Sequence, residues 1–226
     1  MGNLRATVEK ALKSSKSLVI YRDLRKLDIW KIMEQLLENF VDEYFSYDQW
    51  MEDYYEFLHL LFCDLSMSGD AHLSWAEWVL DKVLYSENQF SLLCEKRGDD
   101  FGAEIGRAVE HDLRCIREIG NIPWNELTMF AAQEKCTEDE YKPLGFESRQ
   151  DWDNLIKQKG LGEWTPSELA RYYKRHGAGI FSRYRGFYWN GNALEGIENI
   201  DPITLDQLVG YEIQKSVLME NTEKFL

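Results

Sequence analysis

The 226-residue sequence has few of the residues that interrupt helices. It contains only four prolines, and neither glycine nor proline occurs between Asn3 and Ser68. Glycine and proline are the two residues that most strongly destabilise the interior of a helix. Their absence therefore favours helices in this part of the chain over closely spaced turns and strands.

Cysteine is also scarce, and its spacing excludes the common metal and redox motifs. The four cysteines lie 31, 21 and 21 residues apart, so the sequence has no Cys-x-x-Cys pair. The first sixteen residues are polar and contain lysine, which is not the pattern of a secretory signal. Apolar runs such as Leu60–Cys63 have four residues, whereas a membrane helix needs ~20. We expect reduced, mostly buried thiols and a cytoplasmic protein without a membrane segment.

Positive charge is missing from one long part of the chain. The 26 Lys and Arg residues face 40 Asp and Glu residues, which gives a net charge of −14. No Lys or Arg occurs from Ile32 to Asp81, which holds twelve acidic residues. This charge disfavours a nucleic-acid partner, because phosphates are repelled. Within this stretch, the acidic and aromatic segment Glu34–Glu56 is either a solvated helix face or a docking surface for a basic protein. The partner-binding candidates are Asp42, Glu43, Asp48 and Asp53.

Apolar residues recur at helical spacing through most of the first 175 residues. Ser74-Trp75-Ala76-Glu77 and Thr165-Pro166-Ser167-Glu168 are capping boxes, in which the first and last side chains satisfy free backbone amides at a helix start. Helices are expected to begin at Asp28, Asp48, Ser74 and Thr165, the third continuing to Cys94, and to cover about 101–119, 124–130 and 150–156. The sequence predicts a mainly α protein, with an acidic, all-helical domain over residues 1–165.

A short β-hairpin is expected after these helices. Phe187-Tyr188-Trp189 is followed by Asn190-Gly191, a pair typical of a type I′ hairpin turn. Thr204 can then cap a final helix that runs through Val209 to Leu218. We therefore predict a basic and aromatic linker over residues 166–200, made of a helix and a hairpin, and a separate segment over residues 201–226.

The same linker carries the one basic and aromatic cluster of the sequence. Arginine beside aromatic rings can stack on bases and bind phosphates, or it can neutralise the acidic half of the chain within the fold. These alternatives stay open. The phosphate or nucleic-acid candidates are Arg171, Lys174, Arg175, Arg183 and Arg185.

Catalytic signatures are missing. The sequence has no Gly-x-Ser-x-Gly, no His-Glu-x-x-His and no Gly-Lys pair, so it cannot form a Walker A phosphate loop. Glu56 and His59 have the Glu-x-x-His spacing of di-metal bundles, but the second copy that such a site needs is absent. In Glu110-His111-Asp112, adjacent side chains point in different directions on a helix. We expect no catalytic residue, no metal and no cofactor in this chain.

The last fifty residues contain two longer patterns, Gly179–Trp189 and Asn199–Glu212, and close on Glu220–Leu226. In the second pattern, Leu205-Asp206-Gln207-Leu208-Val209-Gly210 is similar to the entry motif of AAA+ ATPases, hydrophobic-Asp-x-hydrophobic-Val-Gly. Together they resemble the lead-in to the ATPase module of a bacterial AAA+ family known mainly as a domain of unknown function. The resemblance implies a Walker A loop outside this sequence, and ATP and magnesium bound by the full-length protein. It also implies an adenine site lined by Leu208, Val209, Gly210 and Tyr211.

Three functions remain open. The resemblance favours an accessory or regulatory N-terminal region that recruits a partner or substrate for its own C-terminal ATPase module and is inactive by itself. The alternatives are a free-standing helical adaptor for a basic protein and a nucleic-acid-binding module around Arg171–Trp189. If the ATPase module is the natural cover of the final helix, residues 195–226 are expected to be mobile or covered by self-association.

Overall fold

The computed structural model describes residues 2–42, 44–67, 74–133, 163–197, 204–207 and 209–224, and these residues are mainly helical, as the sequence predicts. The chain forms two compact units, Met1–Arg183 and Tyr184–Leu226. We call them the helical unit and the C-terminal unit, and each is described by itself. The expected helix over 150–156 and the predictions at Glu43, Cys136 and Leu208 lie outside the described residues.

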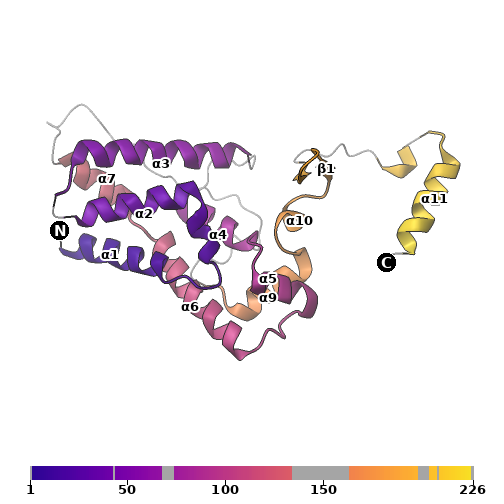
Figure 1. The fold of residues 1–226 in the computed structure, drawn as a ribbon, viewed down its shortest axis with the longest axis horizontal. Helices are drawn as coiled ribbons and strands as arrows, with labels where there is room; N and C mark the ends of the chain where they lie inside the picture. Colours follow the sequence, from indigo (N-terminus) through magenta and orange to yellow (C-terminus); the bar gives the residue numbers. More distant parts are fainter. Residues whose placement is uncertain are drawn as a thin grey trace. The chain divides into compact units, whose positions relative to one another are not determined.

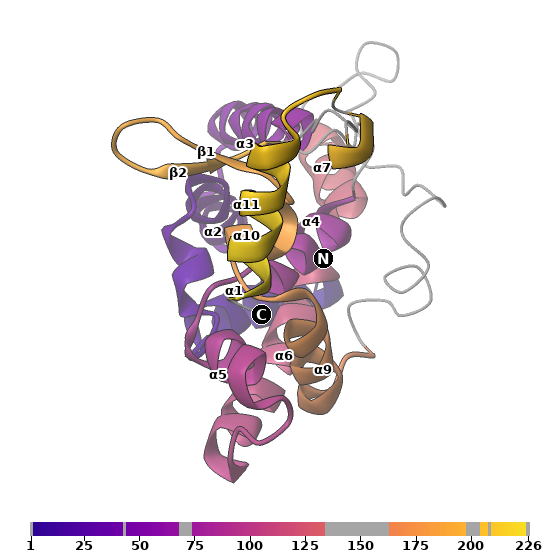
Figure 2. The same cartoon turned by 90° about the vertical axis from the view of Figure 1, so that its right-hand side faces the viewer.

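The helical unit is built from a series of α-helices and one 3₁₀ turn, η1. Figure 1 shows α1, α2 and α3 lying roughly parallel, one above the next, and each neighbouring pair is in contact. Turned by 90°, Figure 2 shows α9 beside α5 and α6, which it also contacts. The elements are α1 (Gly2–Lys16), η1 (Arg22–Lys26), α2 (Asp28–Val41), α3 (Tyr47–Met67), α4 (Trp75–Leu84), α5 (Gln89–Arg97), α6 (Ala103–Gly120), α7 (Trp124–Gln133), α9 (Pro166–His176) and α10 (Ile180–Arg183).

The helix starts follow from local capping. Both predicted capping boxes form, with Ser74 and Glu77 at the start of α4 and with Thr165 and Glu168 at the start of α9. The prediction of one helix from Ser74 to Cys94 is wrong, because Asn88 accepts hydrogen bonds from two backbone amides and starts α5 as a separate helix. Asp28 is the first residue of α2 rather than its cap, a position where its charge favours the helix dipole.

An aromatic core joins four helices of this unit. Trp75 and Trp78 of α4 stack with ring centroids 5.1 Å apart, and Phe57 of α3 stacks on Trp124 of α7 at 4.6 Å. Trp30 of α2 lies 6.1 Å from Trp75. Large aromatic side chains bury much apolar area and prefer defined ring geometries. This cluster therefore fixes how α2, α3, α4 and α7 meet.

The C-terminal unit contains the expected hairpin, in which β1 (Phe187–Trp189) pairs antiparallel with β2 (Leu194–Gly196). The predicted type I′ turn at Asn190-Gly191 is wrong. Trp189 pairs with Leu194, so the loop has four residues, and the Asn190 side chain accepts hydrogen bonds from the amides of Asn192 and Ala193. Such an Asx turn needs no left-handed conformation at the asparagine, and only Gly191 has a positive φ there.

The final helix is shorter than the sequence predicts. Leu205–Gln207 forms a 3₁₀ turn, η2, and α11 covers Glu212–Glu223. Between them Gly210 and Tyr211 are both left-handed, with φ of +84° and +62°. A right-handed helix cannot continue through two such residues, so the prediction of one helix from Thr204 is wrong. Gly210 and Tyr211 therefore form the turn between η2 and α11.

Candidate functional site

The basic candidates in the helical unit make different contacts. Lys174 of α9 donates to the carbonyls of Glu95 and Lys96 at 3.1 and 3.2 Å, which places its charge at the C-terminal end of α5. Arg171 and Arg175 are exposed one turn apart on α9. Arg185 is exposed and belongs to the C-terminal unit, so it is described apart from the others. Whether these residues bind phosphate stays a prediction.

Arg183, the last residue of the helical unit, lies in a charged cluster on α4. Its guanidinium is 3.6 Å from the carboxylate of Asp81 and lies over the ring of Tyr85 at 5.3 Å. Lys82 contacts the same carboxylate at 3.7 Å and Asp64 of α3 at 2.6 Å. Burial raises the pKa of Asp81, and Arg183 and Lys82 only partly offset this effect. The cluster links α10 to α4. Its two cations, Arg183 and Lys82, neutralise acidic residues within the fold.

Two of the acidic candidates also make contacts within the fold. Asp53 of α3 accepts hydrogen bonds from the side-chain amides of Gln35, Asn39 and Gln49, so it joins α2 to α3. Asp42 accepts from the backbone amide of Tyr44 and stabilises the turn between these helices. Asp48 is exposed on the first turn of α3.

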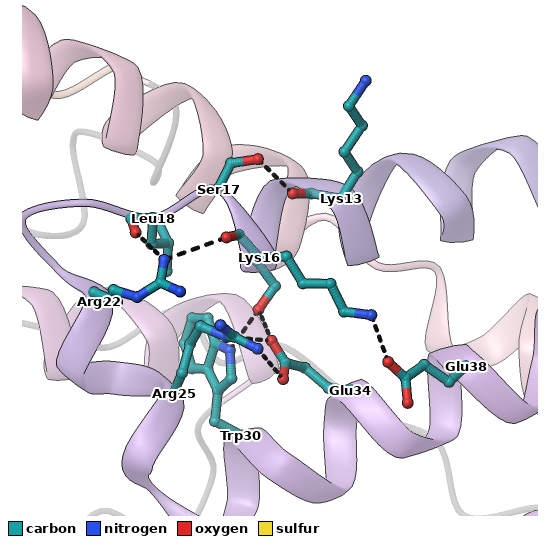
Figure 3. Close-up of polar contacts among 10 residues, drawn as sticks. Lys13, Lys16, Ser17, Leu18, Arg22, Arg25, Trp30, Glu34 and Glu38 are labelled. Carbon is teal, nitrogen blue, oxygen red and sulfur yellow. Dashed lines mark hydrogen bonds and ion pairs between the residues drawn. The ribbon is translucent and has the colours of Figure 1, made fainter.

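Other acidic residues of this segment are used in the same way (Figure 3). Arg25 donates twice to Glu34, at 2.7 and 3.0 Å, and Lys16 pairs with Glu38 at 2.6 Å. Ser15 bridges Glu34 to the indole of Trp30. Burial tends to raise the pKa of the Glu34 carboxyl, but the hydrogen bonds from Arg25 and Ser15 outweigh burial and hold it below its usual range. These carboxylates therefore pair α2 with α1 and η1.

Two carboxylates of α3 differ from all of these. Glu52 and Glu56 are exposed, and among the described residues neither has a hydrogen-bond or ion-pair partner. They follow Asp48 at intervals of four residues, so the three lie in a row along one side of α3. The exposed aromatic rings of Tyr55 and Phe62 continue the same side. Neither glutamate is among the candidates expected from the sequence, although their fourfold spacing on a helix is a signal that could have identified them.

Asp112 is a structural residue that the sequence interpretation missed. It is fully buried on α6, and its carboxylate accepts hydrogen bonds from the backbone amides of Val19, Ile20 and Tyr21 at 2.7 to 3.1 Å. Three successive amides that converge on one anion form a nest, which stabilises the charge. The position of Asp112 in the apolar stripe of α6, three residues after Val109, is the sequence pattern that could have indicated its burial.

In the C-terminal unit, the entry-motif residues are exposed. Val209 is 94% exposed and Tyr211 is 69% exposed, and α11 has no buried residue. Ile213, Val217 and Leu218 of α11 are also exposed, by 78%, 51% and 54%. Nothing in the described part of this unit covers these apolar side chains. Whether Val209, Gly210 and Tyr211 bind adenine stays a prediction.

The described residues offer little for catalysis. Burial raises the pKa of the Cys94 thiol to about 11 and also raises that of Cys115, which disfavours a thiolate nucleophile at either position. Open grooves of about 490 and 290 Å³ lie beside α7, and Glu126 is the one ionisable side chain described in either lining. Within the described ranges no three potential metal ligands cluster, and no helix is long and apolar enough to cross a membrane.

The comparisons with known proteins concern the end of the chain. A family profile described as a protein of unknown function (DUF815) matches residues 182–226. This match confirms the coarser part of the expected resemblance, a family of unknown function. No curated protein and no solved structure matches the chain. The matched segment begins two residues before the C-terminal unit and includes all of it, so the family resemblance belongs to that unit.

Proposed function

We propose that this chain is the accessory N-terminal region of a AAA+ type ATP-binding protein. In this proposal the helical unit recruits a partner or substrate, and the C-terminal unit joins it to an ATPase module that binds ATP and magnesium. The chain itself does not hydrolyse ATP. The observation that carries the proposal is the uncovered apolar surface of the C-terminal unit, which coincides with the segment that matches the family.

The apolar surface of the C-terminal unit needs a cover. A helix of twelve residues, such as α11, is marginal in water unless its apolar side packs on something. A two-stranded hairpin is marginal for the same reason. Burial of a few hundred Å² of apolar surface contributes several kcal/mol at ~25 cal/mol per Å². In this proposal a sheet of the ATPase module next to α11 supplies such a cover.

The first test is the length of the polypeptide in its source, measured by intact mass and by reading the codons after Leu226. A longer product with Gly-x-x-x-x-Gly-Lys-Ser/Thr downstream supports the proposal. A native end at Leu226 contradicts it. In a longer product, Ile213→Asp with Val217→Asp should weaken ATP binding at least about tenfold, because burying two charges on the module is costly. The matched control is Gln214→Asp with Ser216→Asp, which adds the same charge to exposed polar positions of α11.

Glu52 and Glu56 of α3 are exposed and have no partner among the described residues. They favour a second candidate, a helical adaptor that binds a basic protein without an ATPase module. This candidate gives the helical unit the same recruiting role. The nucleic-acid module has less support, because Lys174 and Arg183 make contacts inside the helical unit.

A further inference from the structure

The exposed side of α3 carries a cysteine and a histidine one turn apart. The thiol sulfur of Cys63 lies 3.7 Å from Nε2 and 3.9 Å from Nδ1 of His59, and both side chains are exposed. Residues four apart on a helix lie on the same side. In a tetrahedral zinc site, bonds of ~2.0 Å to nitrogen and ~2.3 Å to sulfur place these two ligand atoms about 3.5 Å apart. The pair therefore has the spacing that two ligands of one zinc ion require.

A second pair, on α6, has the same spacing but is used by the fold. The sulfur of Cys115 lies 3.6 Å from Nε2 of His111, and that nitrogen is 3.1 Å from the backbone carbonyl oxygen of Ser17. Cys115 is only 8% exposed, and burial raises the pKa of its thiol, which disfavours the thiolate that a metal binds. The pair on α6 is therefore a structural contact, whereas the exposed pair on α3 is within reach of a metal ion from solvent.

The charge around the α3 pair favours a cation. Glu56 lies one turn before His59 on the same side of α3, and Glu52 lies one turn before Glu56. Both are exposed, and no Lys or Arg occurs from Ile32 to Asp81. A surface of one sign raises the local concentration of the opposite ion. Neither glutamate completes the site, because within the described part of the chain no three potential ligands cluster. One chain therefore supplies two of the four ligands that zinc prefers.

We propose that His59 and Cys63 bind a zinc ion together with the same two side chains of a second copy of this chain. The ion lies on the two-fold axis that relates the copies, held by two thiolates and two imidazoles in a tetrahedron. Each thiol releases its proton to water, and each histidine binds as the neutral imidazole. Phe62, which is 51% exposed beside Cys63, packs on the second copy. Within the helical unit, α3 lies at the edge of the stack that it forms with α2 and α1 (Figure 1).

The same charge makes the metal necessary for this pairing. Two copies that face each other through α3 bring Glu52 and Glu56 of both chains together, and like charges repel. Zinc bonds to four ligands contribute more than this repulsion, which is screened by salt at exposed positions. The dimer therefore forms with zinc and separates without it. This inference goes beyond the proposed ATPase module and does not depend on it.

The test uses the full chain with reduced thiols and Co²⁺ as an optical probe of the zinc position. Cobalt should give a thiolate-to-cobalt charge-transfer band and the strong visible bands of a tetrahedral site, at one ion per two chains, and zinc should displace it. Sedimentation velocity should show a dimer with zinc and a monomer with a chelator. Cys63→Ser and His59→Gln should each weaken cobalt binding at least about tenfold, because each removes two of the four ligands from the dimer.

The matched controls are Cys115→Ser and His111→Gln, which remove the same groups from the α6 pair and should leave cobalt binding and the dimer unchanged. Circular dichroism confirms that each variant folds. Equal losses from both pairs, one ion bound per monomer, or a dimer that persists with the chelator overturns the inference, as does no cobalt binding by the unmodified chain. The Ile213→Asp, Val217→Asp variant should bind cobalt normally, so failure here is distinct from failure of the ATPase proposal.

Discussion

Asp112 shows how one buried charge determines the path of a distant segment. Its carboxylate lies on α6, and the three amides that it accepts from follow α1, more than ninety residues earlier in the chain. Backbone amides buried without a partner cost free energy, and so does a buried carboxylate. Here the three amides and the carboxylate satisfy each other's hydrogen bonding. The turn after α1 and the buried side of α6 therefore stabilise one another.

We expect Asp112→Ala to lower the free energy of unfolding by about 3 kcal/mol, because it leaves three amides without their anion. Asp112→Asn should cost less, since its amide oxygen still accepts but carries no charge. Urea unfolding followed by circular dichroism measures both. Glu110→Ala, two residues away and exposed, is the control and should change stability by less than about 0.5 kcal/mol. Similar values for Asp112→Ala and Glu110→Ala contradict the role of the nest.

At the scale of helices and strands, α10 is too short to be stable by itself and is held in place by an ion pair. It has four residues and none of them is buried, too few to be stable alone. Arg183 fixes its end to α4 through Asp81 and the ring of Tyr85. The folded pKa of Asp81 is raised by burial, so its ionisation opposes folding once the pH exceeds the ordinary aspartate pKa of ~3.9. Arg183 reduces that penalty.

We therefore expect Arg183→Met to destabilise the protein by about 1–3 kcal/mol at pH 7 and by much less near pH 4. Without the guanidinium the Asp81 pKa rises further, and the penalty disappears only when the carboxyl is protonated in both folded and unfolded states. Thermal unfolding at both pH values measures the difference. Asp81→Asn added to Arg183→Met should recover part of the loss. Arg175→Met, exposed on α9, is the control, and an equal loss in it contradicts the model of a buried pair.

At the scale of helices and strands, the sequence could predict the features that depend on neighbouring residues. Capping boxes and the hairpin depend on residues a few positions apart, so Ser74, Thr165 and the pair β1–β2 were correctly predicted. The predicted helix from Thr204 was wrong because Tyr211 adopts a left-handed conformation. The unbroken helix to Cys94 was wrong because Asn88 caps a new helix. The spacing of apolar residues indicates neither of these local conformations. The partners of Asp112, Asp53 and Arg183 are distant in sequence, so nothing local identifies them.

At the scale of the whole molecule, the helical unit has a buried apolar core, whereas no described residue of the C-terminal unit is buried. In the helical unit, tryptophan rings from several helices are fully buried. The C-terminal unit exposes its apolar residues, and the family profile matches it. A unit that is incomplete without another surface should have low local stability, because few buried contacts oppose the opening of its backbone hydrogen bonds.

This difference predicts the pattern of amide hydrogen exchange. In a monomeric sample, the amides of α11 and of the β1–β2 hairpin should exchange within about tenfold of an unfolded peptide, whereas those in α2 and α6 should be protected by many orders of magnitude, up to the global free energy of unfolding. Exchange followed by mass spectrometry on the whole chain makes both measurements in one sample, so the helical unit is the internal control. Addition of an ATPase module that binds α11 should slow exchange there and leave α6 unchanged. Slow exchange of α11 in a monomer without that module contradicts the proposed need for a cover.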